Sequence, residues 1–221
     1  MNRRKLSAAA RSACVAALGL VVMVGSIAIA TPSKDLKPAS GPELELPPGW
    51  TEADMKACMV AGTPGKMHEH LAKGAGVWHG KTTMWMAPGA EPMTSDCTST
   101  VTPMMDGRYI KVEMAGEMPG MGPYSGFGIY GFDNVSKKFV STWVDNHSTG
   151  IMNGTGDLSP DGKTTSWTYN VNCPITGKPT VMREVETVTG PDTKTLEMFG
   201  TGPKGDKEYK MMRIELTKKK S

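Results

Sequence analysis

The sequence has 221 residues, of which 25 are lysine or arginine and 22 are aspartate or glutamate, and its formal net charge is +3 at pH 7. That length suits one domain with a substantial hydrophobic core. Four of the basic residues and none of the acidic ones lie in the first 30 positions, so the remaining chain carries 21 basic against 22 acidic residues. This balance excludes the strongly positive surface on which nucleic-acid binding depends, and we expect no nucleic-acid partner.

Residues 1–30 have the pattern of a secretory signal peptide. Basic residues at positions 3 to 5 precede an apolar run, which ends in an Ala-x-Ala site at residues 28–30. The run is shorter than the roughly 20 apolar residues of a membrane span and is rich in small side chains. We expect cleavage, export to the periplasm or beyond the cell, and no membrane attachment of the mature chain. Retention of the segment as an anchor is the alternative.

The next part of the chain divides into a linker and a short helical segment. Residues 31–50 are rich in proline and charged side chains, which predicts a linker without a core. Residues 51–72 are the helical candidate, because Thr51 and Asp54 have the spacing of a capping box and apolar residues follow at helical intervals. The Pro64-Gly65 pair predicts a break into two short helices.

From Gly76 onward the apolar residues recur at every second position. Ile110, Val112 and Met114, for example, share one face of a predicted strand whose other face is polar. Turn signals rich in glycine, proline and aspartate separate about ten such segments. The predicted strands lie near 76–87, 93–102, 107–115, 124–132, 138–146, 149–157, 163–171, 179–189, 193–200 and 207–217.

Consecutive strands joined by short turns normally pair with one another. A long meander closes most economically as an antiparallel up-and-down β-barrel, because closure removes the exposed edges. We therefore expect a mainly β protein with one domain over residues 51–218, in which the helical segment precedes the barrel. A two-sheet β-sandwich is the alternative.

Several segments of the chain resemble a bacterial family catalogued as domain of unknown function 1579. The segments are 68–78, 128–133, 137–145, 196–199 and 207–212, so the resemblance covers roughly residues 64–218. The family has no established activity, and the resemblance therefore assigns no role to any residue. Gly76-Val77-Trp78 also looks like the Gly-x-Trp of lipocalins, which implies a calycin-like barrel by analogy.

Trp143, Asp145 and His147 share one face of a predicted strand. If that face points inward, Trp143 is an apolar wall and Asp145 is a buried acid that needs a partner, for which Arg183 or Arg213 is available. The arrangement is typical either of a binding pocket or of an ion pair that closes one end of the barrel. The residues that we expect to line a pocket are Trp78, Met84, Trp143, Asp145, Arg183 and Met198.

One motif suggests a cofactor but lies in the wrong context. Residues 126–131 match Gly-x-Gly-x-x-Gly, whereas dinucleotide binding requires a helix that begins at the motif. Here the motif falls within a predicted strand, where glycine permits a bend or the close approach of another backbone. We expect no cofactor.

Methionine and cysteine leave two possibilities open. Met104, Met105, Met114, Met118 and Met121 are close in sequence, and thioethers suit Cu(I), although methionine also fills irregular cores. Outside the cytoplasm a pair of cysteines can oxidise. The candidate pair is Cys97 and Cys173, which leaves Cys58 free.

The function that these features favour is non-catalytic binding of a small apolar ligand or of a partner surface by an exported barrel. One alternative is an enzyme that uses Asp145 as an acid or base. The other is a methionine-rich copper-binding protein.

Overall fold

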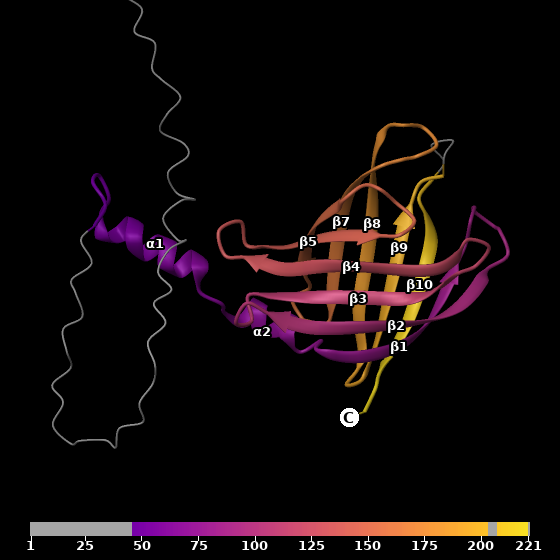
Figure 1. The fold of residues 1–221 in the computed structure, drawn as a ribbon, viewed down its shortest axis with the longest axis horizontal. Helices are drawn as coiled ribbons and strands as arrows, with labels where there is room; N and C mark the ends of the chain where they lie inside the picture. Colours follow the sequence, from indigo (N-terminus) through magenta and orange to yellow (C-terminus); the bar gives the residue numbers. More distant parts are fainter. Residues whose placement is uncertain (1–45, 203–206, 221) are drawn as a thin grey trace, which may run out of the picture. The chain divides into compact units, whose positions relative to one another are not determined.

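The computed structural model describes residues 46–202 and 207–220, in which two short helices precede a closed barrel of ten antiparallel strands (Figure 1). The predicted signal peptide and most of the predicted linker lie outside the described residues. Neither described helix is long and apolar enough to cross a membrane.

The helical segment begins and breaks where the sequence predicts. α1 (Glu52–Gly62) starts with the expected capping box: the Thr51 hydroxyl accepts from the Asp54 amide at 3.2 Å, and the Asp54 carboxylate accepts from the Thr51 amide at 2.8 Å. α2 (Lys66–Ala72) follows the break. α1 has no buried residue, so local capping rather than core packing stabilises it.

The ten predicted strands are all present, with ends that differ by a few residues. This agreement follows from the alternation of inward and outward side chains along most of the strands. The strands are β1 (Gly76–Met84), β2 (Met93–Met104), β3 (Tyr109–Met118), β4 (Gly122–Asp133), β5 (Lys138–Asp145), β6 (Met152–Leu158), β7 (Thr164–Asn172), β8 (Pro179–Gly190), β9 (Thr193–Gly200) and β10 (Tyr209–Lys218).

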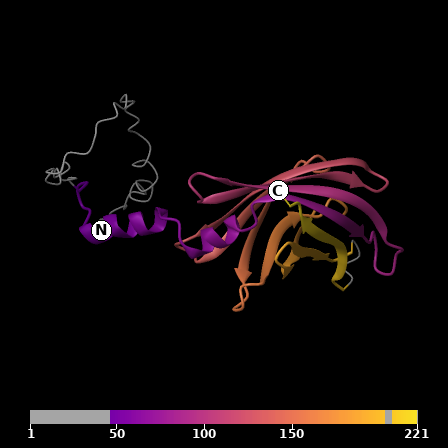
Figure 2. The same ribbon diagram turned by 90° about the horizontal axis from the view of Figure 1, so that it is seen from below.

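Each strand pairs with the next in the chain, and β1 pairs with β10 to close the wall. The up-and-down barrel is therefore confirmed, and the alternative of a sandwich is wrong. In Figure 1, β1 to β5 run across the view, whereas β7 to β9 are steeply inclined to them. Figure 2 shows the same barrel turned by 90°. Such tilt is what closure of a sheet requires.

The inner face of the barrel carries two hydrophobic clusters. One is centred on Trp78 and Ile214, and the other on Phe139, Trp167 and Tyr169. α2 joins the barrel core because Leu71 packs against both clusters, and the buried His68 ring lies edge-on to the Phe132 ring at 5.9 Å. The helix thereby closes part of the end of the barrel at which β1 begins.

Glycines on two strands make room for aromatic rings on the neighbouring strands. Gly128 is the cross-strand partner of Trp143, and Gly156 is the partner of Trp167. A Cβ atom at Gly156 would lie 2.8 Å from the Trp167 ring. The Gly-x-Gly-x-x-Gly sequence at 126–131 therefore provides space for a ring inside the barrel, as its position within β4 predicts.

Candidate functional site

The interior of the barrel is not filled, and a cavity of about 390 Å³ remains between the sheet and α2. This volume lies in the range of small-molecule sites, which are mostly apolar with a few polar groups. Its apolar wall comes from strands on all sides of the barrel. The apolar lining residues include Leu71, Val101, Ile110, Val112, Met114, Trp143, Met152, Trp167, Val188, Leu196, Met198, Met212, Ile214 and Leu216.

The main polar group of this cavity is the Glu184 carboxyl on β8. Glu184 is only 4% exposed, and its direct cross-strand partners are Trp167 on β7 and Met198 on β9. Burial between these apolar side chains and, to a smaller extent, the nearby Glu186 carboxylate raise the pKa of Glu184 to about 8. The group is therefore mainly protonated and neutral at pH 7.

Glu186 and Lys194 form an ion pair next to Glu184. The Lys194 ammonium lies 3.0 Å from the Glu186 carboxylate and 4.9 Å from the centre of the Trp78 ring. Because Lys194 already has these two partners, it offsets only part of the effect of burial on Glu184. No hydrogen bond or ion pair among the described residues involves the Glu184 carboxyl.

Aromatic side chains surround the same region of the cavity. The Tyr130 ring meets the Trp167 ring edge-on at 5.3 Å, and the Tyr169 ring is stacked on Trp167 at 6.2 Å. Burial raises the pKa of both tyrosine hydroxyls above its usual range, so both stay protonated donors. The buried Trp167 indole N–H has no hydrogen-bond partner among the described residues.

The end of the cavity near α2 is also polar. His70 of this helix and Lys73, which directly follows it, line the cavity, and the His70 ring packs against Phe139 at 6.2 Å. Burial lowers the pKa of His70, and the positive charge of Lys73 lowers it further. His70 is therefore neutral at pH 7, and it adds a hydrogen-bonding group rather than a charge.

The predicted pocket residues lie in different places. Trp143 and Met198 line the cavity, and Trp78 is buried in the adjoining core cluster. Met84 is the cross-strand partner of Met212 on β10. The Trp143 indole N–H donates to the Tyr124 hydroxyl at 3.1 Å, and burial raises the pKa of this tyrosine to about 12.

Asp145 and Arg183 do not meet. The Asp145 carboxylate accepts a hydrogen bond from the backbone N–H of His147 at 2.9 Å. Arg183 instead pairs with Glu208 at 2.8 Å and covers the Phe199 ring. The cavity therefore places Glu184, rather than Asp145, in the position of the buried acid that needs a partner.

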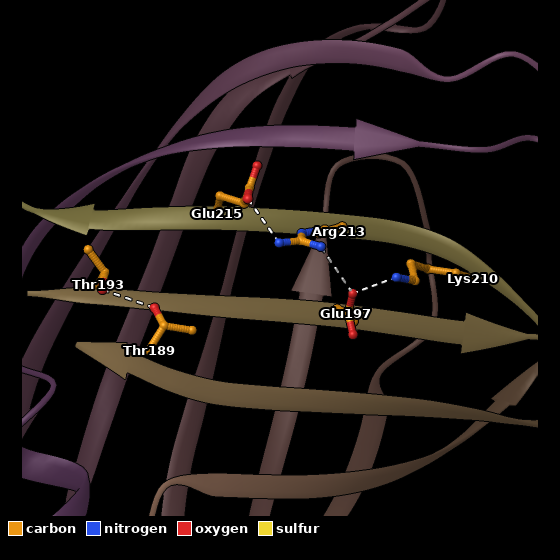
Figure 3. Close-up of polar contacts among 6 residues, drawn as sticks. All are labelled: Thr189, Thr193, Glu197, Lys210, Arg213 and Glu215. Carbon is orange, nitrogen blue, oxygen red and sulfur yellow. Dashed lines mark hydrogen bonds and ion pairs between the residues drawn. The ribbon is translucent and has the colours of Figure 1, made fainter.

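Arg213, the other expected partner of Asp145, belongs to a network on β9 and β10 (Figure 3). Its guanidinium lies 2.9 Å from Glu215 and 3.7 Å from Glu197, and Glu197 also accepts from Lys210 at 2.6 Å. These side chains alternate with those that line the cavity, so the network lies on the outer face of the barrel.

The five methionines near residue 114 are not gathered at one point. Met104 and Met105 lie at the start of the turn that precedes β3. Met118 and Met121 lie at the opposite end of β3, about 30 Å away at roughly 3.3 Å per residue. Met114 alone among the five lines the cavity. These residues therefore do not form one five-methionine copper site.

The cysteines of the described residues are free thiols, so the predicted Cys97–Cys173 pair is not formed in the structure. Cys97 is buried, and burial raises the pKa of its thiol. No cluster of three or more histidine, cysteine, aspartate or glutamate side chains that could hold a metal ion occurs within 46–202 and 207–220.

Glu184, Glu186 and Lys194 are not among the pocket residues that the sequence predicts. One signal in the sequence could have indicated them. Lys194, Leu196 and Met198 occupy every second position of the predicted strand at 193–200 and therefore share one face. The turn at 190–192 makes a hairpin of this strand and the previous one, and the hairpin places Glu184 opposite Met198.

Comparison with known proteins supports the fold but gives no activity. The sequence model of a family described as "Protein of unknown function (DUF1579)" matches residues 63–218. No curated protein matches the chain. Rv2717c from M. tuberculosis has a similar structure, with a TM-score of 0.52 and 13% identity over 72% of this chain and 100% of that one. The S-type phycobiliprotein lyase CPES from Guillardia theta gives a TM-score of 0.49 and 10% identity over 71% of this chain and 94% of that one.

Proposed function

This chain belongs to the DUF1579 family of proteins of unknown function, and we propose from its own geometry that it binds a small, mostly apolar molecule inside the barrel without catalysis. The observation that carries the proposal is the cavity of about 390 Å³, which has a mostly apolar wall and a buried carboxyl that no described residue pairs with. The signal-peptide pattern at 1–30 supports a site of action outside the cytoplasm.

The energetic case for a ligand rests on the cavity wall. Apolar side chains that face an unfilled space lose dispersion contacts that a ligand of the right shape restores. Burial of a ligand's apolar surface adds roughly 25 cal/mol per Å². The rigid barrel also orders the site before binding, so little conformational entropy is lost when a ligand enters.

A matched pair of substitutions tests the proposal. Val112 lines the cavity, whereas Val181 is 54% exposed on the outer face of β8. Val112→Phe adds a ring inside the cavity, and Val181→Phe adds the same ring outside it. The probe is decanol, titrated into each purified protein in a calorimeter, with thermal melting to confirm that both variants are folded.

We expect saturable binding of decanol at one site, loss of about tenfold or more of the affinity in Val112→Phe, and no change in Val181→Phe. Equal affinities in the two variants, or no saturable binding to the unmodified protein, would contradict the proposal. Native mass spectrometry of protein purified from its source then shows whether a natural ligand copurifies.

A second candidate is acid–base catalysis inside the same cavity. Its support is the Glu184 carboxyl, because a carboxyl that titrates near neutral pH can both donate and accept a proton. Under this candidate Glu184 takes the role that the sequence assigned to Asp145. Chemical conversion of the copurified ligand by the unmodified protein, but not by Glu184→Gln, would favour catalysis over binding.

A further inference from the structure

We propose that the cavity selects ligands that carry an amine on an apolar body, with the protonated amine bound by the Glu184 carboxylate among Trp167, Tyr130 and Tyr169. The inference rests on the proposed function, and it adds the chemical class of the ligand.

The first step concerns the charges that face the cavity. Glu184 lies between an apolar and an aromatic cross-strand partner, and no described residue pairs with it. Its nearest charged neighbours, Glu186 and Lys194, pair with one another at 3.0 Å. The pair is neutral as a whole, and Lys73, the other lysine that lines the cavity, is not among the charges that shift the pKa of Glu184. An ionised Glu184 therefore has no cation of its own among the described residues.

The second step concerns the ligand that offsets this charge. A buried carboxylate is stable only when a charge or hydrogen bonds compensate it. A protonated amine supplies both the opposite charge and N–H donors, whereas an alcohol supplies one donor and no charge. A carboxylate ligand would place a further negative charge beside Glu184 and Glu186, which is unfavourable at this depth.

The third step concerns the aromatic side chains. Trp167, Tyr130 and Tyr169 all line the cavity, and they are packed against one another beside Glu184. Aromatic faces attract cations by about 0.5–2 kcal/mol when the cation is removed from water. An acid with several aromatic rings in one cavity is therefore better suited to an ammonium group than to a neutral or anionic one.

Binding of an ammonium ion requires that Glu184 lose its proton. Because burial holds the pKa of Glu184 near 8, the affinity for an amine should rise as pH rises towards 8. The other titratable groups that line the cavity are Glu186 on the same strand, Lys194 on β9, Tyr124 and Tyr130 on β4, Tyr169 on β7, His70 on α2 and Lys73 directly after α2. Burial lowers the pKa of His70 from its ordinary 6.5, so His70 is mainly neutral at pH 7 and above.

The test uses three ligands of the same chain length: decylamine, decanol and decanoate, each below its micelle-forming concentration. Calorimetric titrations compare the unmodified protein with Glu184→Gln, which keeps the shape of the side chain and removes its charge. The control is Glu215→Gln, since Glu215 lies in the network on the outer face of the barrel.

We expect decylamine to bind at least about tenfold more tightly than decanoate at pH 7, and its affinity to increase roughly tenfold from pH 6 to pH 7. Glu184→Gln should remove both effects and leave decanol binding within about twofold, which also shows that the variant is folded. Glu215→Gln should change nothing.

Two results would overturn the inference in different ways. If decanol binds but decanoate binds as tightly as decylamine, or if Glu184→Gln keeps the preference for decylamine, the cavity binds ligands but does not select amines. If none of the three ligands binds, the proposed function fails together with the inference.

Discussion

Glu184 on β8 and Trp167 on β7 are direct cross-strand partners on the inner wall of the barrel. This pairing places an acid against an indole ring in a cavity whose lining is mostly apolar. The relationship explains both the raised pKa of the carboxyl and the suitability of the cavity for a ligand with one polar group.

Glu184→Gln should change the dependence of stability on pH. The pKa of Glu184 rises from an ordinary 4.5 to about 8 on folding, so the folded protein holds a proton that the unfolded chain releases. The contribution of this group is therefore most favourable in acid and is lost as pH rises from about 5 to about 8, by at most about 1.4 kcal/mol per pH unit.

Urea unfolding at several pH values between 5 and 8.5 checks this prediction. The free energy of unfolding of the variant should decline less with pH than that of the unmodified protein. Parallel pH profiles for the two proteins would show that Glu184 is not protonated in the folded state at neutral pH.

Gly156→Ala should destabilise the barrel by about 1–3 kcal/mol, because the new methyl group would overlap the Trp167 ring. Gly150→Ala is the matched control, since nothing lies within 4 Å of a Cβ atom at that position. Chemical unfolding measures both. A similar small effect of the two substitutions would mean that Trp167 moves without cost.

The fold could be predicted from the sequence because most strands alternate between apolar and polar residues and short turns join them. Alternation in β3, where Ile110, Val112 and Met114 face inward, gives the side-chain direction directly. The Thr51–Asp54 capping box and the break at Pro64-Gly65 gave the helices for the same reason, since both depend on residues that are close in sequence.

The site was less predictable because β8 departs from the same rule. Val181 and Val185 lie on one face of β8, whereas Glu184 and Glu186 share the other face with Met182 and Val188. Hydrophobicity alone therefore does not decide which face is inside. The structure puts Glu184 inside, since pairing with β7 and β9 fixes the register of β8 more strongly than its own pattern does. Asp145 and Arg183 were expected to be close because their charges are opposite. No local sequence pattern could show that Asp145 instead accepts a hydrogen bond from the His147 backbone and that Arg183 pairs with Glu208.

Asn134→Ala should loosen α1 without weakening the barrel. The Asn134 side-chain amide donates to the carbonyls of Ala61 at 3.1 Å and Thr63 at 2.8 Å, and so it satisfies acceptors at the end of the helix. Because α1 buries no residue, its loss should leave the melting temperature nearly unchanged. Hydrogen exchange should be faster in residues 52–62 of this variant, and Val135→Ala should have no effect. Loss of the barrel transition would contradict the prediction.

Glu197→Gln should change the free energy of unfolding by less than about 1 kcal/mol. Its partners Lys210 and Arg213 remain partly exposed on the outer face of the barrel (Figure 3), and exposed ion pairs contribute little. The difference in the free energy of unfolding between Glu197→Gln and the unmodified protein should be smaller still in 1 M salt, because the screening length there is about 3 Å. Thermal unfolding at low and high salt measures it, and a loss of several kcal/mol would show that this network is part of the core.

The most direct test of ligand binding inside the barrel uses methionine methyl groups as reporters in an NMR titration with decanol. Four methionines line the cavity, whereas Met59, Met86, Met105 and Met121 are at least half exposed on the surface. We predict saturable shifts for Met114, Met152, Met198 and Met212 and none for the exposed four. Shifts confined to the exposed methionines, or no shifts at all, would contradict binding in the cavity.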